Sequence, residues 1–128
     1  ALLKQCPDYA SLEDALDEAV QMVIKSKRIV YHLYRSADRA LVEMYLMRIC
    51  EQVILSYIHD NRGDLTVSPE DKTIIVRYYK CQCFGMIIDW LNSDMRFDIA
   101  AEARRMYELR KGMPEEIVRR ASMQRPKA

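Results

Sequence analysis

One glutamate interrupts an otherwise apolar arc in the middle of the chain, and its carboxylate is the group best placed to hold a small molecule. At about 100° per residue, five positions of one predicted helix share this arc: Met44, Met47, Glu51, Leu55 and Ile58. A carboxylate among apolar side chains can fix a cationic or hydroxylated ligand. Arg48, three residues before Glu51, supports the competing interpretation of an ion pair on the helix surface.

Eight tyrosines and eight methionines add further candidates for a pocket lining. Tyrosine combines a rigid apolar body with one polar group, and methionine adapts to irregular shapes. Stripes of these residues at helical spacing are more often ordinary core, so both interpretations stay open. His32 is likewise either a pocket donor or the hydrogen-bond partner of a neighbouring tyrosine. The ligand-pocket candidates are Tyr31, Tyr34, Met44, Met47, Glu51, Leu55, Tyr78 and Tyr79.

The four cysteines and two histidines form no metal-ligand motif. Cys81 and Cys83 diverge by roughly 200° on a helix, so they cannot hold one metal ion together. We therefore expect reduced thiols, a cytoplasmic protein, and neither metal nor cofactor. The sequence also lacks the Glu-x-x-His pairs of di-iron bundles, a Gly-rich phosphate loop, a nucleophile elbow and an HExxH motif. We do not expect an enzyme.

Composition indicates one globular domain. Half of the 128 residues are hydrophobic and 30% are charged, while only 3 glycines and 4 prolines argue against a turn-rich β fold. A net charge of +1 gives no nucleic-acid footprint, and no apolar run is long enough for a membrane span. Because the chain opens at Ala1 rather than at Met, we expect it to be the later part of a longer protein.

Periodicity and capping residues predict an all-α bundle. Ser11, Asp38 and Asp98 are the expected helix caps, the KSKR run at 25–28 is an expected solvated break, and 61–67 is an expected loop. The expected helices are 11–26, 29–36, 39–59, 69–93 and 98–111. Residues 113–128 form a basic tail that can begin with a short helix.

The helix predicted over 69–93 has an unusually complete start and two apolar sides. Ser68 can cap it, Pro69 suits its first position, and Glu70 and Asp71 favour the positive end of the helix dipole. One side holds Ile75, Val76, Tyr79, Cys83, Met86, Ile87 and Trp90; the other holds Ile74, Tyr78, Cys81, Phe84, Gly85, Ile88 and Leu91. Such a helix either lies between its own domain and a second subunit, which we favour, or is the central helix of one monomeric bundle.

The chain resembles the C-terminal, effector-binding domain of bacterial TetR/AcrR-type transcriptional regulators. The residues that carry the resemblance are IVYHLYRSADRALVEMYL, CEQVILSYI, IIVRYYKCQCFGMIIDWLNSDMRFDI and a closing helix ending in ELRKG, so it spans roughly residues 11–112. Gly85 followed by Trp90 and Leu91 fits a helix that is common in that family. Asp94 departs from it, because relatives often have glycine before the methionine that matches Met95, and the turn there is expected to close differently.

The resemblance implies a homodimer whose last two long helices, about 69–93 and 98–111, form a four-helix bundle with their mates. It also implies a small hydrophobic or amphipathic effector, and operator DNA bound only through an N-terminal helix-turn-helix domain that is not in this sequence. The expected dimer-interface residues are Met86, Asp89, Trp90, Ile99, Ala103, Met106 and Tyr107. The alternative is a helical homodimeric interaction module that binds no small molecule. The resemblance assigns residues 1–112 to the regulatory and dimerisation domain.

Overall fold

The computed structural model describes residues 12–60 and 67–123, together with all their side chains except those of residues 59, 60 and 123. Within these ranges the chain is all-α, as the sequence predicted. The helices are α1 (Leu12–Lys25), α2 (Lys27–Tyr34), α3 (Arg39–Asp60), α4 (Pro69–Asn92), α5 (Ile99–Leu109) and α6 (Met113–Met123).

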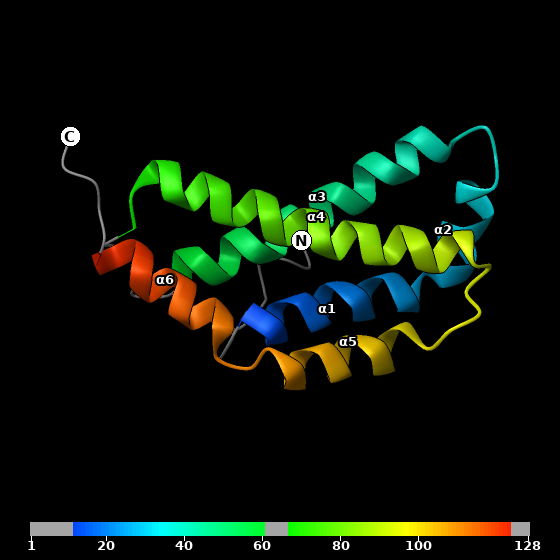
Figure 1. Ribbon diagram of the computed structural model, residues 1–128. Coiled ribbons are helices and arrows are strands. Elements are labelled where there is room, and N and C mark those ends of the chain that lie inside the picture. The colour runs from blue at the N-terminus through cyan, green and yellow to red at the C-terminus, as the bar shows by residue number, and fades with distance from the viewer. Residues whose placement is uncertain (1–11, 61–66, 124–128) are drawn as a thin grey trace.

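The helices form a bundle around α3, which contacts α1, α2 and α4. Figure 1 shows α4 lying along α3, with α1 below this pair and α5 along the opposite side of α1. The short helix α2 covers one end of the bundle, and α6 lies at the other end. Helix α5 contacts α1 more extensively than it contacts α4.

Two of the expected helix caps, Ser68 and Asp98, act as predicted. The Ser68 side chain accepts a hydrogen bond from the Asp71 amide at 3.1 Å, and the Asp98 carboxylate accepts one from the Ala101 amide at 3.0 Å. Each bond satisfies an amide that would otherwise lack a partner in the first turn. The expected cap at Ser11 and most of the expected loop at 61–67 lie outside the described residues.

Helix boundaries differ from the predictions by a few residues. The expected break at 25–28 is narrower, because only Ser26 separates α1 from α2. The closing helix ends at Leu109 rather than Lys111, and Gly112 follows with a φ of 87° that glycine adopts easily. The short helix expected at the start of the tail is present as α6.

The turn after α4 explains why glycine would suit position 94. The Met95 amide donates to the Trp90 carbonyl at 2.9 Å and the Asp94 amide donates to the Leu91 carbonyl at 3.0 Å, which is the Schellman arrangement. This arrangement requires a left-handed residue, and Asp94 has a φ of 60°. The Asp94 carboxylate accepts a hydrogen bond from the Tyr31 hydroxyl at 2.7 Å. This hydrogen bond and the nearby Arg35 guanidinium hold the pKa of Asp94 below its usual value.

Only one of the two apolar sides of α4 faces the core. Ile75, Val76, Tyr79, Cys83, Ile87 and Trp90 are buried. On the other side Ile74 is 49% and Tyr78 is 73% exposed, and only Leu91 at its end is fully buried. No atom outside its own helix backbone and chain neighbours lies within 4 Å of a methyl group built on Gly85. The fold of one chain therefore leaves Ile74, Tyr78 and Gly85 of this stripe, called the open stripe of α4 below, exposed, whereas Phe84 and Ile88 are partly buried against the core.

Candidate functional site

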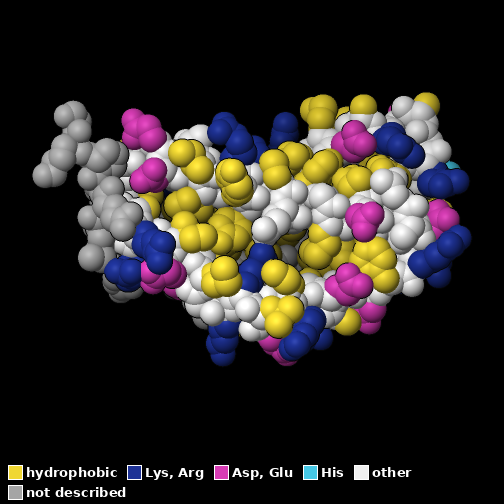
Figure 2. Space-filling view, viewed as in Figure 1, with side chains coloured by type: hydrophobic (Ala, Val, Ile, Leu, Met, Phe, Trp, Pro, Cys, Tyr) yellow, Lys and Arg dark blue, Asp and Glu magenta, His cyan; other side chains and the backbone are white. Residues whose placement is uncertain are grey.

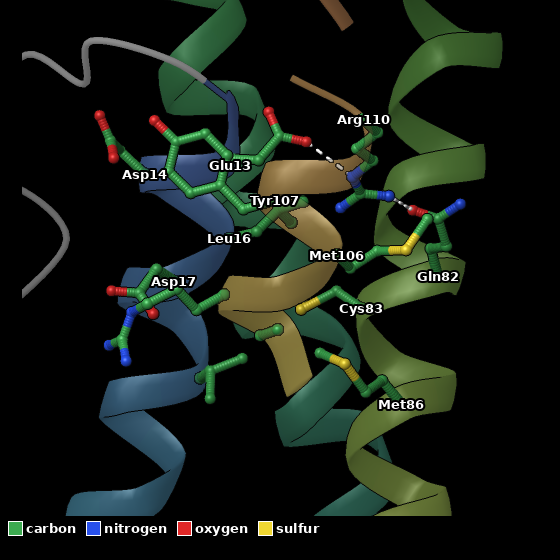
Figure 3. Close-up of a pocket in the computed structure, with 13 residues that line it drawn as sticks. Glu13, Asp14, Leu16, Asp17, Gln82, Cys83, Met86, Met106, Tyr107 and Arg110 are labelled. Atoms are coloured by element: carbon green, nitrogen blue, oxygen red, sulfur yellow. Dashed lines mark hydrogen bonds and ion pairs between the residues drawn. The ribbon is translucent and has the colours of Figure 1, made fainter. Parts of the chain in front are cut away.

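A cavity of about 460 Å³, the larger of two described below and called the main cavity, lies between α1, α4 and α5 (Figure 3). This volume falls within the range of pockets that hold drug-sized molecules. It is lined by Glu13, Asp14, Leu16, Asp17, Val20, Gln82, Cys83, Met86, Ala103, Arg104, Met106, Tyr107 and Arg110.

The walls of this cavity differ in chemistry. Helix α1 contributes all three carboxylates, because Glu13, Asp14 and Asp17 lie within about one turn. The wall formed by α4 presents the sulfur atoms of Cys83 and Met86. Helix α5 and the residue directly after it add an alanine, a methionine, a tyrosine ring and two arginines. The carboxylates of the cavity therefore all lie on its α1 side, and the other sides combine apolar side chains with two guanidinium groups and the Gln82 amide.

A buried ion pair closes one end of the cavity. Arg110 Nε donates to Glu13 Oε2 at 2.7 Å, and the two side chains are 15% and 3% exposed. The same guanidinium donates through Nη1 to the amide oxygen of Gln82, and it lies 5.9 Å from the centre of the Tyr79 ring. Arg110 thus connects the end of α5 to both α1 and α4, as Figure 3 shows for Glu13 and Gln82.

Burial dominates the electrostatics of this ion pair. The pKa of Glu13 is raised from its ordinary value because desolvation of the carboxylate outweighs the attraction of Arg110. Desolvation also raises the pKa of Tyr79, which lies beside the same arginine. Burial also raises the pKa of Tyr57 to about 12, and the Glu115 carboxylate of α6 contributes to this increase. These shifts mark a region of low polarity around a charged pair.

None of the predicted pocket residues lines this cavity. Tyr31 and Tyr34 lie near the far end of the bundle, where their hydroxyls donate to Asp94 at 2.7 Å and Asn92 at 2.6 Å. Met44 and Tyr78 are exposed, Met47 is half-buried, and Tyr79 is buried in the core beside Arg110. The structure thus distributes these residues over several regions.

Glu51 and Leu55 do border a hollow, but a smaller and more polar one. It measures about 190 Å³ and is lined by Glu51, Leu55, Lys72, Thr73, Val76, Arg77 and Lys80. Glu51 accepts a hydrogen bond from Lys80 at 3.1 Å, across the interface of α3 and α4. The sequence had suggested Arg48 as its ion-pair partner, and the structure gives Lys80 instead.

The residues expected at the dimer interface fall into three groups. Met86, Ala103, Met106 and Tyr107 line the main cavity. Trp90 and Ile99 are buried in the core of their own chain, and the Trp90 indole donates to the Phe97 carbonyl at 3.0 Å. Asp89 is exposed. Four of the seven residues expected at the interface therefore lie close together, and they surround the main cavity.

The cavity residues that sequence reasoning missed are the polar ones on α1, α4 and α5. Glu13 lies in the first turn of α1, where an acidic residue is ordinary because it favours the helix dipole. Arg110 follows the last turn of α5, where a basic residue is equally ordinary. The one available signal was that position 13 borders the apolar stripe of α1, next to Leu12 and Leu16.

Cys50 and Cys83 face each other between α3 and α4. Both are free thiols and buried, and a hydrogen bond to Cys83 together with desolvation raises the pKa of Cys50 far above its ordinary value. The Cys50 thiol is therefore unreactive at neutral pH. Across residues 12–60 and 67–123, no group of three or more His, Cys, Asp or Glu side chains could hold a metal ion.

Comparison with known proteins identifies one family. A TetR-type family model described as the C-terminal region of transcriptional regulators matches residues 10–112, which is most of the chain. No curated protein and no solved structure matches the chain. The matched range contains α1 to α5, and therefore every residue that lines the main cavity.

Replacing Arg110 by methionine should destabilise the fold strongly, because it leaves the Glu13 carboxylate buried without its cation. Loss of one member of a buried ion pair costs about 3 kcal/mol of unfolding free energy. The double variant Glu13→Gln/Arg110→Met should recover at least half of this loss. Urea unfolding followed by circular dichroism measures both. As a control, Arg105→Met removes an exposed pair with Glu108 and should cost less than about 1 kcal/mol. Equal losses for the two arginines would contradict the importance of the buried pair.

The raised pKa of Glu13 predicts a pH dependence with a definite sign. The pKa of the Glu13 carboxyl in the folded chain lies above its ordinary value of 4.5. The folded chain therefore binds the carboxyl proton more tightly than the unfolded chain does. The contribution of this tighter proton binding to the unfolding free energy is thus complete at pH values below the ordinary pKa. It is lost as the pH rises through the pKa that Glu13 has in the folded chain. We expect the unfolding free energy of the parent chain, minus that of Glu13→Gln, to fall as the pH rises above about 4.5. Urea titrations at several pH values measure this difference. A difference that grows with pH would show that Arg110 outweighs burial.

Proposed function

Because the chain belongs to the TetR-type family of transcriptional-regulator C-terminal regions, we propose that it senses a small effector and joins two copies of a bacterial regulator. In this proposal operator DNA is bound by an N-terminal domain outside this sequence, and the protein acts in the cytoplasm. The family consists of regulators of transcription, a class that is generally not enzymatic. Among the helices of residues 12–60 and 67–123, none combines the length and the hydrophobicity of a membrane-spanning segment.

The cavity of about 460 Å³ between α1, α4 and α5 is the observation that carries the sensing function. Its mainly apolar walls and buried polar end suit an amphipathic molecule of drug-like size. A ligand there would contact three helices at once, and Arg110 connects the same three. A change in this region can therefore alter how α1 lies against α4 and α5, which is what a sensor requires.

The open stripe of α4 is the surface that supports dimerisation. Ile74 and Tyr78 are exposed along it, and Gly85 leaves room for a second helix to approach closely. Figure 2 shows hydrophobic side chains gathered over α4 and along its border with α5. Exposed apolar patches of this kind mark protein interfaces. We propose this stripe, together with the outer face of α5, as the seam of a symmetric pair. Met86, Ala103, Met106 and Tyr107 are assigned to the effector cavity that borders it.

An interaction module that binds no small molecule is the alternative function, and it would share the same dimer. The two differ in one measurable respect, which is whether a compound stabilises the folded chain. The presence of a well-sized cavity favours the sensor.

Compounds that occupy the cavity should raise the melting temperature of the chain, because a ligand bound only to the folded state stabilises it. Ala103 lines the cavity, and Ala103→Phe should fill part of it and abolish the shift. Ala101 is exposed on the same helix and does not line the cavity, so Ala101→Phe should retain the shift. A thermal-shift screen with small amphipathic compounds provides the measurement. A chain that still dimerises but is stabilised by none of them would favour the interaction module.

A charge on the open stripe of α4 should convert the dimer to a monomer. Tyr78 is 73% exposed in one chain, so Tyr78→Asp should fold normally but place an unpaired charge in the seam. Ile29 is similarly exposed, at 66%, but it belongs to α2 and not to the proposed seam. Ile29→Asp is therefore the matched control and should stay dimeric. Size-exclusion chromatography with light scattering measures both masses. A monomeric parent chain, or an unchanged dimer in Tyr78→Asp, would refute this seam.

A further inference from the structure

The guanidinium of Arg110 has more hydrogen-bond donors than its neighbours in the fold accept from. Its Nε donates to Glu13 at 2.7 Å, its Nη1 donates to the amide oxygen of Gln82, and the Tyr79 ring lies 5.9 Å away. A guanidinium also carries N–H groups on Nη2. In the part of the chain that the structure describes, no acceptor binds them. The Arg110 side chain is nevertheless only 15% exposed.

These remaining donors border the main cavity. Arg110 belongs to the cavity lining, and Figure 3 shows its head group between Glu13 and Gln82. Leu16 and Met106 of the same lining offer no strong acceptor. A molecule that fills this end of the cavity excludes water from Nη2. A wholly apolar molecule would therefore leave these N–H groups buried without a partner, which costs binding free energy.

The neighbouring Glu13 carboxylate decides the charge of a suitable acceptor. It is 3% exposed and already pairs with Arg110 at 2.7 Å. A ligand carboxylate bound to the same guanidinium would lie close to Glu13 in a site of low polarity, where like charges repel strongly. A carbonyl oxygen accepts the same hydrogen bond without adding a charge. Hydrogen bonds from a charged donor are stronger than neutral ones, so a carbonyl group here contributes to affinity.

We infer that the effector of the main cavity carries an uncharged carbonyl oxygen that accepts a hydrogen bond from Nη2 of Arg110. Its apolar body lies against Cys83, Met86 and Met106 on the α4 and α5 walls. This inference rests on the proposed sensing function and specifies the ligand class for that same site. It also places the ligand on the residue that connects the end of α5 to α1 and α4, so binding acts directly on that connection.

Three naphthalene derivatives of similar shape provide the test. The ketone 2-acetylnaphthalene carries the carbonyl group, 2-isopropenylnaphthalene has a methylene group in place of the oxygen, and 2-naphthoate carries a carboxylate. Isothermal titration calorimetry on the full chain should show the ketone binding at least about ten-fold more tightly than the alkene, which corresponds to about 1.4 kcal/mol. Because the alkene is the more hydrophobic of the two, this preference reports the hydrogen bond.

Removing the guanidinium should abolish the preference for the ketone. Glu13→Met/Arg110→Met replaces the buried pair by apolar side chains, an exchange that folds often tolerate. In this variant the ketone should lose about ten-fold in affinity. The affinity for the alkene should stay unchanged, which shows that the cavity is intact. Arg105 lies on α5 outside the cavity lining, and Arg105→Met should retain the full preference.

The carbonyl stretching vibration of the bound ketone gives a measurement that needs no variant. A hydrogen bond from a charged donor weakens the C=O bond. Infrared difference spectra of the parent chain should therefore place this vibration at a lower frequency than for the ketone in hexane. An unshifted frequency would overturn the hydrogen bond to Arg110, even if the double variant does not fold.

The charge of Glu13 provides the comparison with 2-naphthoate. In the parent chain the carboxylate ligand should bind less tightly than the ketone. In Glu13→Gln its affinity should rise about ten-fold, because the like charge beside Arg110 is removed. Tighter binding of 2-naphthoate than of the ketone to the parent chain would overturn the uncharged class.

The remaining outcomes separate this inference from the proposed function. Equal or tighter binding of the alkene to the parent chain would overturn the carbonyl class, while leaving the cavity as an effector site. A preference for the ketone that survives in Glu13→Met/Arg110→Met would overturn the assignment to Arg110. If none of the three probes binds to a chain that is folded and dimeric, both the inference and effector sensing in this cavity fail.

Discussion

The ion pair between Glu13 and Arg110 is the interaction on which the candidate site depends. It joins residues 97 positions apart in sequence and fastens the end of α5 to the beginning of α1. Both side chains of the pair are largely buried, so each charge loses favourable interactions with water. This desolvation is the reason why the pKa of Glu13 is raised. A buried pair of this kind contributes little net stability, but it strongly disfavours arrangements in which either partner is left alone. It therefore fixes where α5 lies.

The position of α5 in turn determines the cavity. Helix α5 packs mainly on α1 and contacts α4 less, so its side chains do not fill the space in front of Cys83 and Met86. Arg110 closes one end of this space through Glu13 and Gln82, and leaves the acidic side of α1 facing the sulfur atoms of α4. The same arrangement leaves the outer stripe of α4 uncovered. One structural constraint thus underlies both the proposed effector site and the proposed dimer seam, which lie on neighbouring parts of α4.

The elements could be predicted from the sequence because their signals are local. The cap at Ser68 acts on the amide three residues later, and the stripe of α1 repeats every three to four residues, so neither depends on distant contacts. The site could not be predicted in this way. Glu51 looked exceptional along its own helix, yet Lys80 of α4 neutralises it, whereas Glu13 looked ordinary and proved to be buried. An acidic residue in a first turn has the same local pattern whether water or an arginine faces it.

The sequence by itself determined the all-α class, the order and approximate bounds of the helices, and the family resemblance that the comparison then confirmed. The tertiary structure decided which apolar side of α4 is buried, because both sides are equally hydrophobic and only packing against α3 distinguishes them. It also brought Met86, Ala103, Met106 and Tyr107, which are expected at a dimer interface, together around one cavity. The physical reason is the same in each case. Backbone propensity and capping act over a few residues, whereas burial and charge pairing depend on which distant segments the fold brings together.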